Sequence, residues 1–561
     1  MTRERAAQEV KPEMGRIGRR RSADGFSVRA SRFVAAAFAA VFVLGACQPV
    51  ATVPKPARGG TAIEALVGQP NVLNPLFESN DSTRDVDSLI YQGLTTVDAQ
   101  QNVVGLLASG WAISADHLTY TFDIRDGVKW ADGQPFGQDD VMFTFHVLQD
   151  LEYQQPGADF WRLVGIAAAG TSQVVFTLKA PSAAFPLALR VGIIPKHIFG
   201  GMAPAQIAAS PFSGLHALGT GPFKVGAINQ LAITLDRNPY AVPQPYLDHL
   251  VMRTYPEPQA AIRAVLSGAA DLVGGLQPQE VSALQGRTDL TVQEQRLFTS
   301  SFVTFNSDGD GKPFFSDPKV RLALVQAIDR QQIVSDVLAG RADPDPSPIP
   351  TANWAYSASA ANLHPFDAVA AAKALDDAGW ILDPATKLRS KKGTQFKVTL
   401  VAADSFPNRQ VADAIARQML DVGVQVDVKA LPATQLVRDY LPGHRYQMAL
   451  VYIDVGPDPD QYTFWHSGAD VGSLNFAYQR GWGLIDKDLE DGRNAIDAPS
   501  RLAAYIDFQM LMADAAPAIF LYAGRYEYVV SQRVHGVHMN KVIEPTDRFQ
   551  YVTDWYVATT G

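Results

Sequence analysis

Short runs of alternating apolar and polar residues mark the first part of the chain. Residues 61–67, 118–124 and 174–178 are rich in β-branched and aromatic side chains, a pattern that predicts strands. The second run leads into Arg125-Asp126-Gly127, which predicts a tight turn. Residues 82–93 predict a helix whose first residue, a serine, can serve as its N-cap. We therefore expect antiparallel hairpins in this part of the chain.

Helical periodicity becomes clearer after residue 300. Asp317-Pro318 can supply the N-cap and first-turn proline of a helix with one apolar face. Asp367 begins an alanine-rich helix that Gly379 ends, and residues 408–422 are amphipathic. Strands alternating with helices predict βαβ units and a partly parallel sheet, so we interpret residues 300–525 as an α/β lobe. The predicted strands of this part are 302–305, 397–401, 424–430 and 447–453.

Size and charge narrow the class of protein. A chain of 561 residues is too long for a single hydrophobic core, so two or three domains are expected. Residues 1–46 hold nine Lys/Arg and four Asp/Glu, a net charge of +5, and the whole chain carries −9. The remainder therefore carries −14, a balance that does not favour nucleic acid or an anionic membrane surface as a partner.

The start of the chain has the order of an export signal. Six arginines between Arg16 and Arg32 precede the uncharged run 33–44, and Gly45-Ala46-Cys47 follows. That apolar run is shorter than the ~20 residues a membrane-spanning helix needs. Cys47 is the only cysteine, so it has no partner for an internal disulfide.

Leu44-Gly45-Ala46-Cys47 resembles the lipobox of bacterial lipoproteins. The resemblance implies a signal peptide over residues 1–46, an acylated Cys47 and a proline-containing tether over residues 47–58. The protein would then be exported, anchored to the membrane through this lipid alone, and would face the periplasm or the exterior. The alternative is an ordinary signal, cleaved elsewhere, in which Cys47 has no role.

Several phrases follow one another along the chain in a characteristic order. They include Leu73-Asn74-Pro75-Leu76, Tyr91-Gln92-Gly93-Leu94, Gly127-Val128-Lys129-Trp130-Ala131-Asp132-Gly133-Gln134-Pro135-Phe136, Gly219-Thr220-Gly221-Pro222-Phe223, Asn238-Pro239-Tyr240, Ala327-Ile328-Asp329-Arg330 and Ala378-Gly379-Trp380. Together they resemble the family 5 extracellular solute-binding proteins, the dipeptide- and oligopeptide-binding components of ABC transporters. The resemblance covers nearly the whole chain after residue 59.

This resemblance implies a mixed α/β, two-lobed periplasmic-binding-protein-like fold with a hinge and an inserted α+β subdomain. Lobe I would comprise residues 59–97, 220–301 and 527–561, the insert residues 98–219, and lobe II residues 302–526. The protein would capture peptides between closing lobes and deliver them to a membrane permease, as a monomer without a cofactor. Relatives with this fold imply other cargo as alternatives: a nickel chelate, haem or an oligosaccharide.

A candidate ligand site follows the predicted strand 447–453. In peptide-binding relatives the matching stretch holds an aspartate that pairs with the ligand amine, and Asp454 fits this role if one extra residue is admitted before Pro457. Tyr452 stands where those relatives have tryptophan. Asp458 and Asp460 could contact ligand or cap a helix that begins near Tyr462. The other candidate ligand contacts are Phe464, Trp465, Tyr478 and Trp482, each of which could equally belong to the core.

Two other interpretations are less favoured. A secreted hydrolase would need an activated nucleophile or a metal, and the chain has no Gly-x-Ser-x-Gly, no His-Glu-x-x-His and no phosphate-binding loop motif. The segment 306–311 with Asp317 has oxygen spacing similar to a calcium loop, but a strand precedes it where a helix is required. A polar loop before a capped helix is the better interpretation. His535 and His538, the only close histidine pair, do not make a metal site.

Overall fold

One large mixed sheet uses strands from almost the whole chain in the computed structural model, which describes residues 55–558 except 79, 285, 470–473 and 478–481. The chain divides into two units, residues 1–55 and 56–561, and every described helix and strand belongs to the second. The predicted signal peptide and Cys47 lie outside the described residues. The sheet runs in the order β19-β18-β20-β13-β21-β11-β1-β10-β9-β8, and β12 and β14 also pair with β21.

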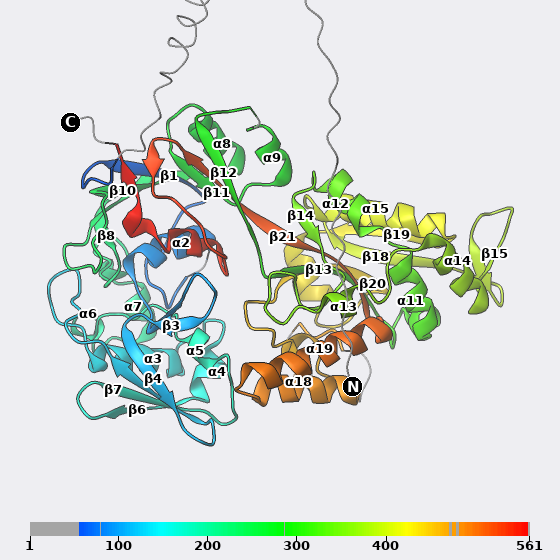
Figure 1. The fold of residues 1–561 in the computed structure, drawn as a ribbon, viewed down its shortest axis with the longest axis horizontal. Coiled ribbons are helices and arrows are strands. Elements are labelled where there is room, and N and C mark those ends of the chain that lie inside the picture. Colours follow the sequence, from blue (N-terminus) through cyan, green and yellow to red (C-terminus); the bar gives the residue numbers. More distant parts are fainter. Residues whose placement is uncertain (1–54, 79, 285, 470–473, 478–481, 559–561) are drawn as a thin grey trace, which may run out of the picture. The chain divides into compact units, whose positions relative to one another are not determined.

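The strands of this sheet are β1 (Thr61–Val67), β8 (Phe223–Asn229), β9 (Ala232–Arg237), β10 (His249–Tyr255), β11 (Leu272–Gly274), β12 (Leu290–Arg296), β13 (Thr299–Phe305), β14 (Ala342–Pro344), β18 (Lys397–Ala403), β19 (Gln425–Leu431), β20 (Met448–Asp454) and β21 (Ala518–Ser531). The long strand β21 connects the two halves of this sheet (Figure 1). Its first residues pair with β13, and its later residues pair with β11 and β12.

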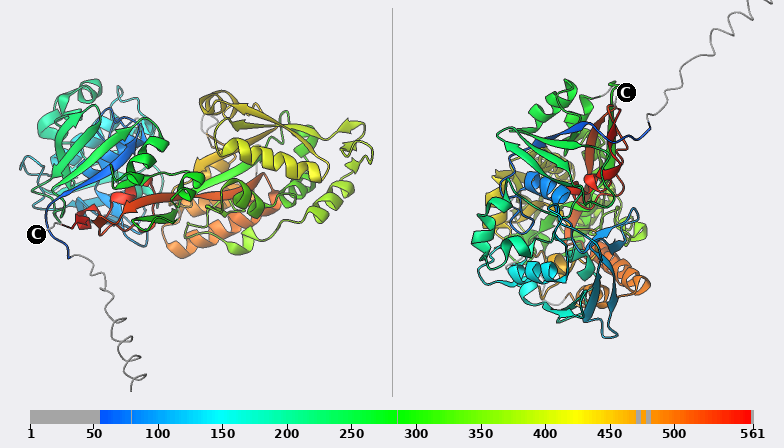
Figure 2. Two further views of the ribbon diagram at one scale, coloured as in Figure 1. Left: turned by 90° about the horizontal axis from the view of Figure 1, so that it is seen from above. Right: turned by 90° about the vertical axis from the view of Figure 1, so that its left-hand side faces the viewer.

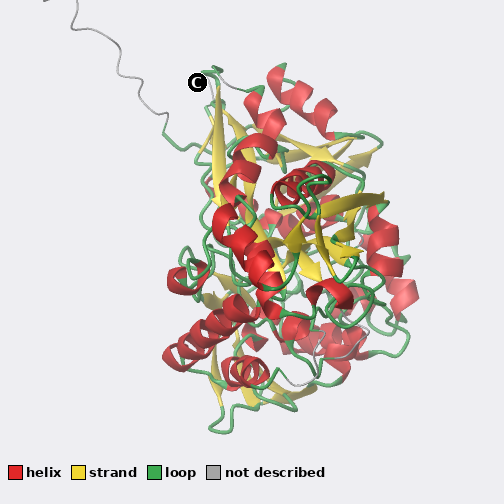
Figure 3. Cartoon of the chain, turned by 90° about the vertical axis from the view of Figure 1, so that its right-hand side faces the viewer, coloured by secondary structure: helices red, strands yellow, loops and turns green. Residues whose placement is uncertain are grey.

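The half built from residues 300–525 has the predicted βαβ arrangement. β18 and β19 are parallel and are connected by α15 (Asn408–Asp421), and β18 is also parallel to β20. Alternate residues of β13 and β20 enter two different apolar clusters, because successive side chains of a strand point to opposite faces. One cluster contains residues of α11, α12, α14 and α15, and the other contains residues of α18 and α19, so helices cover both faces (Figures 1 and 3).

The caps predicted for these helices are confirmed. Asp317 accepts a hydrogen bond from the Lys319 N–H at the start of α11, and Asp367 accepts one from the Ala370 N–H at the start of α14. Gly379 and Gly423 have φ of 83° and 84°, a left-handed conformation that ends a helix at little cost only for glycine. The helices of this half are α10 (Lys312–Phe315), α11 (Pro318–Gln326), α12 (Arg330–Val337), α13 (Ala358–Ala361), α14 (Ala368–Asp377), α15, α16 (Ala433–Gln435), the π-helical turn η2 (Leu436–Tyr440), α17 (Tyr462–Trp465), α18 (Leu484–Asn494) and α19 (Ala498–Ala515), with a small sheet of β15 (Ile381–Leu382), β16 (Arg389–Lys391) and β17 (Thr394–Gln395).

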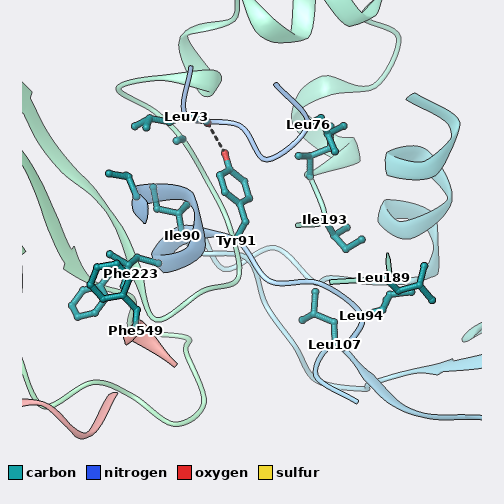
Figure 4. Packing of buried hydrophobic residues seen from close by; sticks show 14 of the residues in the cluster. Leu73, Leu76, Ile90, Tyr91, Leu94, Leu107, Leu189, Ile193, Phe223 and Phe549 are labelled. Carbon is teal, nitrogen blue, oxygen red and sulfur yellow. Dashed lines mark hydrogen bonds between the residues drawn. The ribbon is translucent and has the colours of Figure 1, made fainter. Parts of the chain in front are cut away.

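Residues 98–219 carry a separate four-stranded antiparallel sheet in the order β4-β5-β7-β6, with the predicted turn at Gly127. Its strands are β4 (Ala108–Ile113), β5 (Thr119–Ile124), β6 (Gly165–Ala169) and β7 (Gln173–Thr177), next to the ribbon β2 (Thr95–Val97) and β3 (Val103–Gly105). The helices are α3 (Gln138–Gln149), α4 (Ala158–Arg162), α5 (Phe185–Ala188), α6 (Lys196–Phe199), α7 (Pro204–Ala208) and η1 (Pro211–Ser213). Phe122 and Phe176 of this part share one buried cluster with Leu250 and Leu272 of the large sheet. Figure 4 shows another region of that cluster, where the Tyr91 hydroxyl donates to the Leu73 carbonyl.

The helix predicted for residues 82–93 is α2 (Asp81–Ile90), and the N-cap prediction is wrong. Asn80 is the cap, because its side chain accepts from the Thr83 N–H. Asn80 also precedes the first helical residue, whereas Ser82 lies one residue inside the helix. Helices α8 (Pro258–Leu266) and α9 (Pro278–Ser282) also belong to the half of the molecule that contains β1 and β10 (Figures 1 and 2).

The last segment of the chain returns to the first strand. It contains β22 (Val534–His535), η3 (Pro545–Phe549), η4 (Val552–Asp554) and β23 (Tyr556–Val557). Arg548 of η3 is buried, and its guanidinium pairs with Asp85 of α2 at 2.7 Å and with Glu64 of β1 at 3.1 Å. The Tyr528 hydroxyl donates to the other oxygen of Glu64 at 2.8 Å. This buried ion cluster links β1, α2, β21 and η3.

Candidate functional site

The candidate site lies at the end of β20, where the helical cover of the sheet stops. Met448 and Leu450 are buried against the helices on one face, and Tyr452 and Asp454, further along the same face, are exposed. Opposite them on β13 are Ser301, paired with Tyr452, and Thr299, paired with Asp454. The alternation of the strand therefore presents Tyr452 and Asp454 on the same face, and their contact with ligand stays a prediction.

The Tyr452 side chain reaches across β13 towards Gly524 of β21. A Cβ atom on Gly524 would lie 3.1 Å from the Tyr452 hydroxyl oxygen and 3.2 Å from Thr299 Oγ1. The Gly524 N–H donates to the same Thr299 oxygen at 3.1 Å. Burial raises the pKa of Tyr452 although the residue is 49% exposed. The side chain is thus reachable by solvent and also closely surrounded by protein.

Asp454 is a carboxylate without a cationic partner among the described residues. Its Oδ1 accepts a hydrogen bond from the Gly456 N–H at 2.9 Å, in the turn after the strand. Burial raises the pKa of Asp454, and the Gly456 hydrogen bond opposes this only in part. A desolvated carboxylate that remains accessible favours a positively charged ligand group.

Two acidic residues from outside the sheet, Glu544 and Glu78, also have raised pKa values. Burial raises the pKa of Glu544, Arg190 opposes the rise, and the charges of Asp547 and Asp454 raise it further. Burial also raises the pKa of Glu78 to about 7, and Glu544 contributes to that rise. The charge of Glu544 is thus coupled to Asp454 and to Glu78, although the three residues come from widely separated parts of the chain.

Asp458 and Asp460 are engaged in the structure of the turn. Asp458 pairs with Arg501 at 2.6 Å, and Asp460 pairs with Arg493 at 2.7 Å. Asp460 also accepts from the Tyr462 N–H at 3.0 Å at the start of α17. This placement favours the structural interpretation of both residues, and ligand contact by Asp458 stays a prediction.

The predicted aromatic contacts fall into different environments. Trp465 is 1% exposed and packs on Phe302 and Phe520 with ring centroids 5.6 and 5.7 Å away. Trp482 stacks on Trp465 at 6.3 Å and is partly buried, as is Phe464. Tyr478 lies outside the described residues. The structure thus gathers three of these aromatics around a core that adjoins β20, and their contact with ligand stays a prediction.

The loop that has calcium-like spacing is held by its own asparagine. Asn306 Oδ1 accepts from the Gly309 N–H at 2.7 Å, and its amide donates to the His444 and Tyr446 carbonyls. Within the described ranges no group of three or more His, Cys, Asp or Glu side chains is arranged to hold a metal.

Sequence reasoning missed Glu78, Glu544 and Thr299. Glu78 comes two residues after the phrase Leu73-Asn74-Pro75-Leu76, which could have directed attention to it. Nothing in the pattern around Glu544 distinguishes it from a surface glutamate.

Comparison with known proteins now identifies the class. The model of the bacterial extracellular solute-binding proteins, family 5, matches residues 102–473. The chain belongs to this family. It is 25% identical over 512 residues to the oligopeptide-binding protein AppA of Bacillus subtilis, covering 90% of this chain and 93% of AppA. The family 5 resemblance drawn from the sequence is confirmed.

Solved structures of relatives confirm the two-lobed fold. The AppA structure, which contains a nonapeptide, superposes with a TM-score of 0.71 at 24% identity over 90% of this chain and 100% of AppA. The substrate-binding protein CtaP of Listeria monocytogenes gives 0.76 at 24% identity, over 89% of this chain and 99% of CtaP. NikZ of Campylobacter jejuni, in complex with Ni(L-His), gives 0.71 at 23% identity, over 88% and 99%.

This family 5 protein is a solute-binding protein of the kind that serves ABC transporters, and it is not an enzyme. The family acts outside the cytoplasmic membrane. In the part of the chain that the structure describes, no helix has the length and apolar character needed to span a bilayer.

Proposed function

We propose that this protein captures peptides, or similar solutes with a free amine, and delivers them to the permease of an ABC importer. The observation that carries the proposal is Asp454, an accessible carboxylate with a raised pKa and no described cationic partner. An ammonium group would supply the missing positive charge. The same arrangement gives little reason to bind a neutral or anionic group at this position.

The favourable free energy of binding an amine comes from the desolvation of Asp454 in the unliganded protein. A desolvated carboxylate is held at a cost, and pairing it with an ammonium recovers part of that cost. Glu544 and Glu78 reinforce the preference for a cation, because their charges are not fully balanced by Arg190 and Arg84. Hydrogen bonds to the backbone of an extended peptide would then accept many sequences.

The test compares peptides of mixed sequence with the same peptides acetylated at the amino terminus, by isothermal titration calorimetry. Loss of one partner of a close charge pair costs about 2–5 kcal/mol, so acetylation should weaken binding by about 30-fold or more. Asp454→Asn should lose affinity for the free-amine peptides to the same degree. Asp126→Asn, in the exposed turn after β5, is the matched control and should bind normally. Equal binding of free and acetylated peptides would overturn the role of Asp454.

The same experiment can test which cargo the protein binds, independently of the role of Asp454. The NikZ complex shows that this fold holds a nickel chelate in that protein. Ni(L-His), haem and oligosaccharides therefore serve as competing ligands in the titration. Mass spectrometry of solute that co-purifies with the protein complements it, and recovery of only a chelate or a sugar would contradict the peptide proposal.

Capture is proposed to occur by closure of two lobes that rotate about β13 and β21. Lobe I would comprise residues 59–97, 220–301 and 527–561, with residues 98–219 inserted, and lobe II residues 302–526. Asp454 and Tyr452 then belong to lobe II, whereas Glu78 and Glu544 belong to lobe I. Closure around the cargo would bring the two sets together, and small-angle scattering with and without peptide measures the change.

Membrane attachment is proposed to depend on Cys47 alone, in an exported monomer that binds no nucleic acid. The lipobox-like order of residues 44–47 supports this. Cys47→Ser should move the protein from the membrane fraction to the soluble extract. A variant that stays with the membrane would refute the anchor without affecting the binding proposal.

A further inference from the structure

A cavity lies on the connection between the two halves of the sheet. This cavity of about 450 Å³ is lined by residues from five separate segments, and β12, β14 and β21 meet beside it (Figure 1). The lining residues are Gln101, Glu294, Gln295, Arg296, Thr351, Ala352, Arg525 and Lys541. None of these belongs to the site at the end of β20.

The charged groups around this cavity form one connected network. Asp343 pairs with Arg296 at 2.9 Å and with Arg525 at 2.8 Å. Glu294 pairs with Arg525 at 3.1 Å and also with Arg341, which in turn pairs with Glu527 at 3.1 Å. The three arginines balance the three carboxylates. Lys541, which has no ion pair among the described residues, leaves the network with one positive charge in excess.

Donors without acceptors are the second feature of this cavity. The Thr351 hydroxyl and the Gln101 side-chain amide nitrogen are buried and have no hydrogen-bond partner. Buried donors of this kind cost about 1–3 kcal/mol each when unpaired. Arg296 uses its Nε for Asp343, so its terminal nitrogens remain available. Among the residues that line the cavity, the unpaired buried atoms are thus these two donors, although Glu527 Oε2 and Asp345 Oδ1 behind the lining are unpaired acceptors.

Hydrogen bonds hold the backbone near two of the cavity donors, Lys541 and Thr351. The segment that carries Lys541 is held along β12, because the Gln293 side chain bonds the Met539 N–H and the Val537 carbonyl, and Gln295 donates to the Met539 carbonyl at 3.1 Å. The Thr351 N–H donates to Asp345 Oδ2 at 3.1 Å. These bonds hold the backbone that carries Lys541 and Thr351, whereas the Lys541 and Arg296 side chains are exposed.

We propose that this cavity binds a small oxyanionic group, a carboxylate or a phosphate, through Lys541, Thr351, Gln101 and Arg296. The oxygens of such a group accept the unpaired hydrogen bonds, and its negative charge offsets the lysine. A neutral or cationic ligand would leave the positive charge in excess. The proposal does not depend on the identity of the cargo at Asp454.

Binding would also join the halves of the molecule. Arg296 and Arg525 lie on strands that pair with each other, whereas Thr351 follows β14 and Gln101 follows β2. One anion held by all of these segments stabilises the arrangement in which they converge. The cavity is thus a place where an anion favours one relative position of the strands and the loop.

The experiment titrates the full chain with sodium phosphate and with sodium acetate at constant ionic strength, by calorimetry. We expect one anion to bind per chain. Lys541→Gln and Thr351→Val should each weaken binding on the order of tenfold, which corresponds to loss of one charge-assisted or buried hydrogen bond. Neither residue takes part in an ion pair, so both variants should keep the melting temperature of the unmodified protein without anion.

Lys319→Gln is the matched control, because this lysine is exposed on α11 and forms no ion pair in the described structure. It should bind both anions normally. Absence of binding by either anion, or equal loss in Lys319→Gln and Lys541→Gln, would overturn the proposal. Trialanine and its carboxy-terminal amide then identify the source of the anion. If phosphate competes with trialanine but not with its amide, the anionic group that fills the cavity is the carboxylate of the cargo. If phosphate and trialanine bind independently, the cavity holds a separate ion.

Discussion

Removal of Arg548 should destabilise the protein strongly and in a pH-dependent manner. Arg548 is 2% exposed, and its guanidinium is the counter-charge for Asp85 and Glu64, which are 7% and 0% exposed. In Arg548→Met a side chain of similar length leaves two carboxylates buried together. Breaking a buried ion pair on one side typically costs about 3–5 kcal/mol.

The structure also indicates how the variant would reduce that cost. The folded variant should bind one proton more than the unmodified protein, since two adjacent buried carboxylates cannot both remain charged. Protonating a glutamate with an ordinary pKa near 4.3 at pH 7 costs about 3.7 kcal/mol, which agrees with the figure for the broken pair. Because the extra proton belongs to the folded state, the deficit grows as pH rises and shrinks by about 1.4 kcal/mol for each pH unit lowered towards 5.

Urea denaturation, monitored by fluorescence and circular dichroism and repeated between pH 5 and 8, measures the loss in unfolding free energy and its pH dependence in the same samples. Arg287→Met removes an exposed arginine that pairs with Asp289 and serves as the control, with an expected loss below about 1 kcal/mol. A deficit for Arg548→Met that is equally small, or one that does not change with pH, would refute this account of the cluster.

Three further predictions concern the candidate site. Affinity for amine-bearing peptides should rise with pH through the raised pKa of unliganded Asp454 and then level off, because only the carboxylate pairs with ammonium, and Asp454→Asn should show no such step in calorimetry. Gly524→Ala places a Cβ 3.1 Å from the Tyr452 hydroxyl, so it should displace the Tyr452 side chain. Peptide affinity should fall several-fold, by more than the loss in unfolding free energy accounts for. An unchanged affinity would show that Tyr452 does not belong to the site. Trp465→Ala should lower the unfolding free energy by about 3–5 kcal/mol, as for a core tryptophan; a variant of normal stability with weakened binding would instead place Trp465 in contact with ligand.

Local signals in the sequence were sufficient for many of the elements. Asp317 and Asp367 cap helices as predicted, because an N-cap depends on residues within one turn. The strand that ends at Asp454 was also predictable, since its apolar run is followed by a polar turn. The error at α2 has a local cause as well, because Asn80 and Ser82 are both good caps and the pattern does not choose between them.

Contacts between distant segments could not be predicted in this way. Asp85 and Arg548 pair across 463 residues, and no periodicity in either segment indicates the other. Glu544 likewise influences Asp454 only through the fold. Trp465 illustrates a different limit, because a buried core aromatic and a ligand-lining aromatic have the same appearance in a sequence.

The contacts of the first strand bear on when the protein can fold. β1 pairs with β10 and β11, and its start also meets Arg533, Val557 and, through Glu64, Arg548. During synthesis β1 leaves the ribosome before the other described strands, but its last neighbours are made almost 500 residues later. The core of the half that contains β1 therefore cannot be completed until the carboxy-terminal residues are made. Pairings between such distant residues form slowly. Because we propose that this chain is exported, late closure of the core would leave more time for the polypeptide to be translocated before it folds.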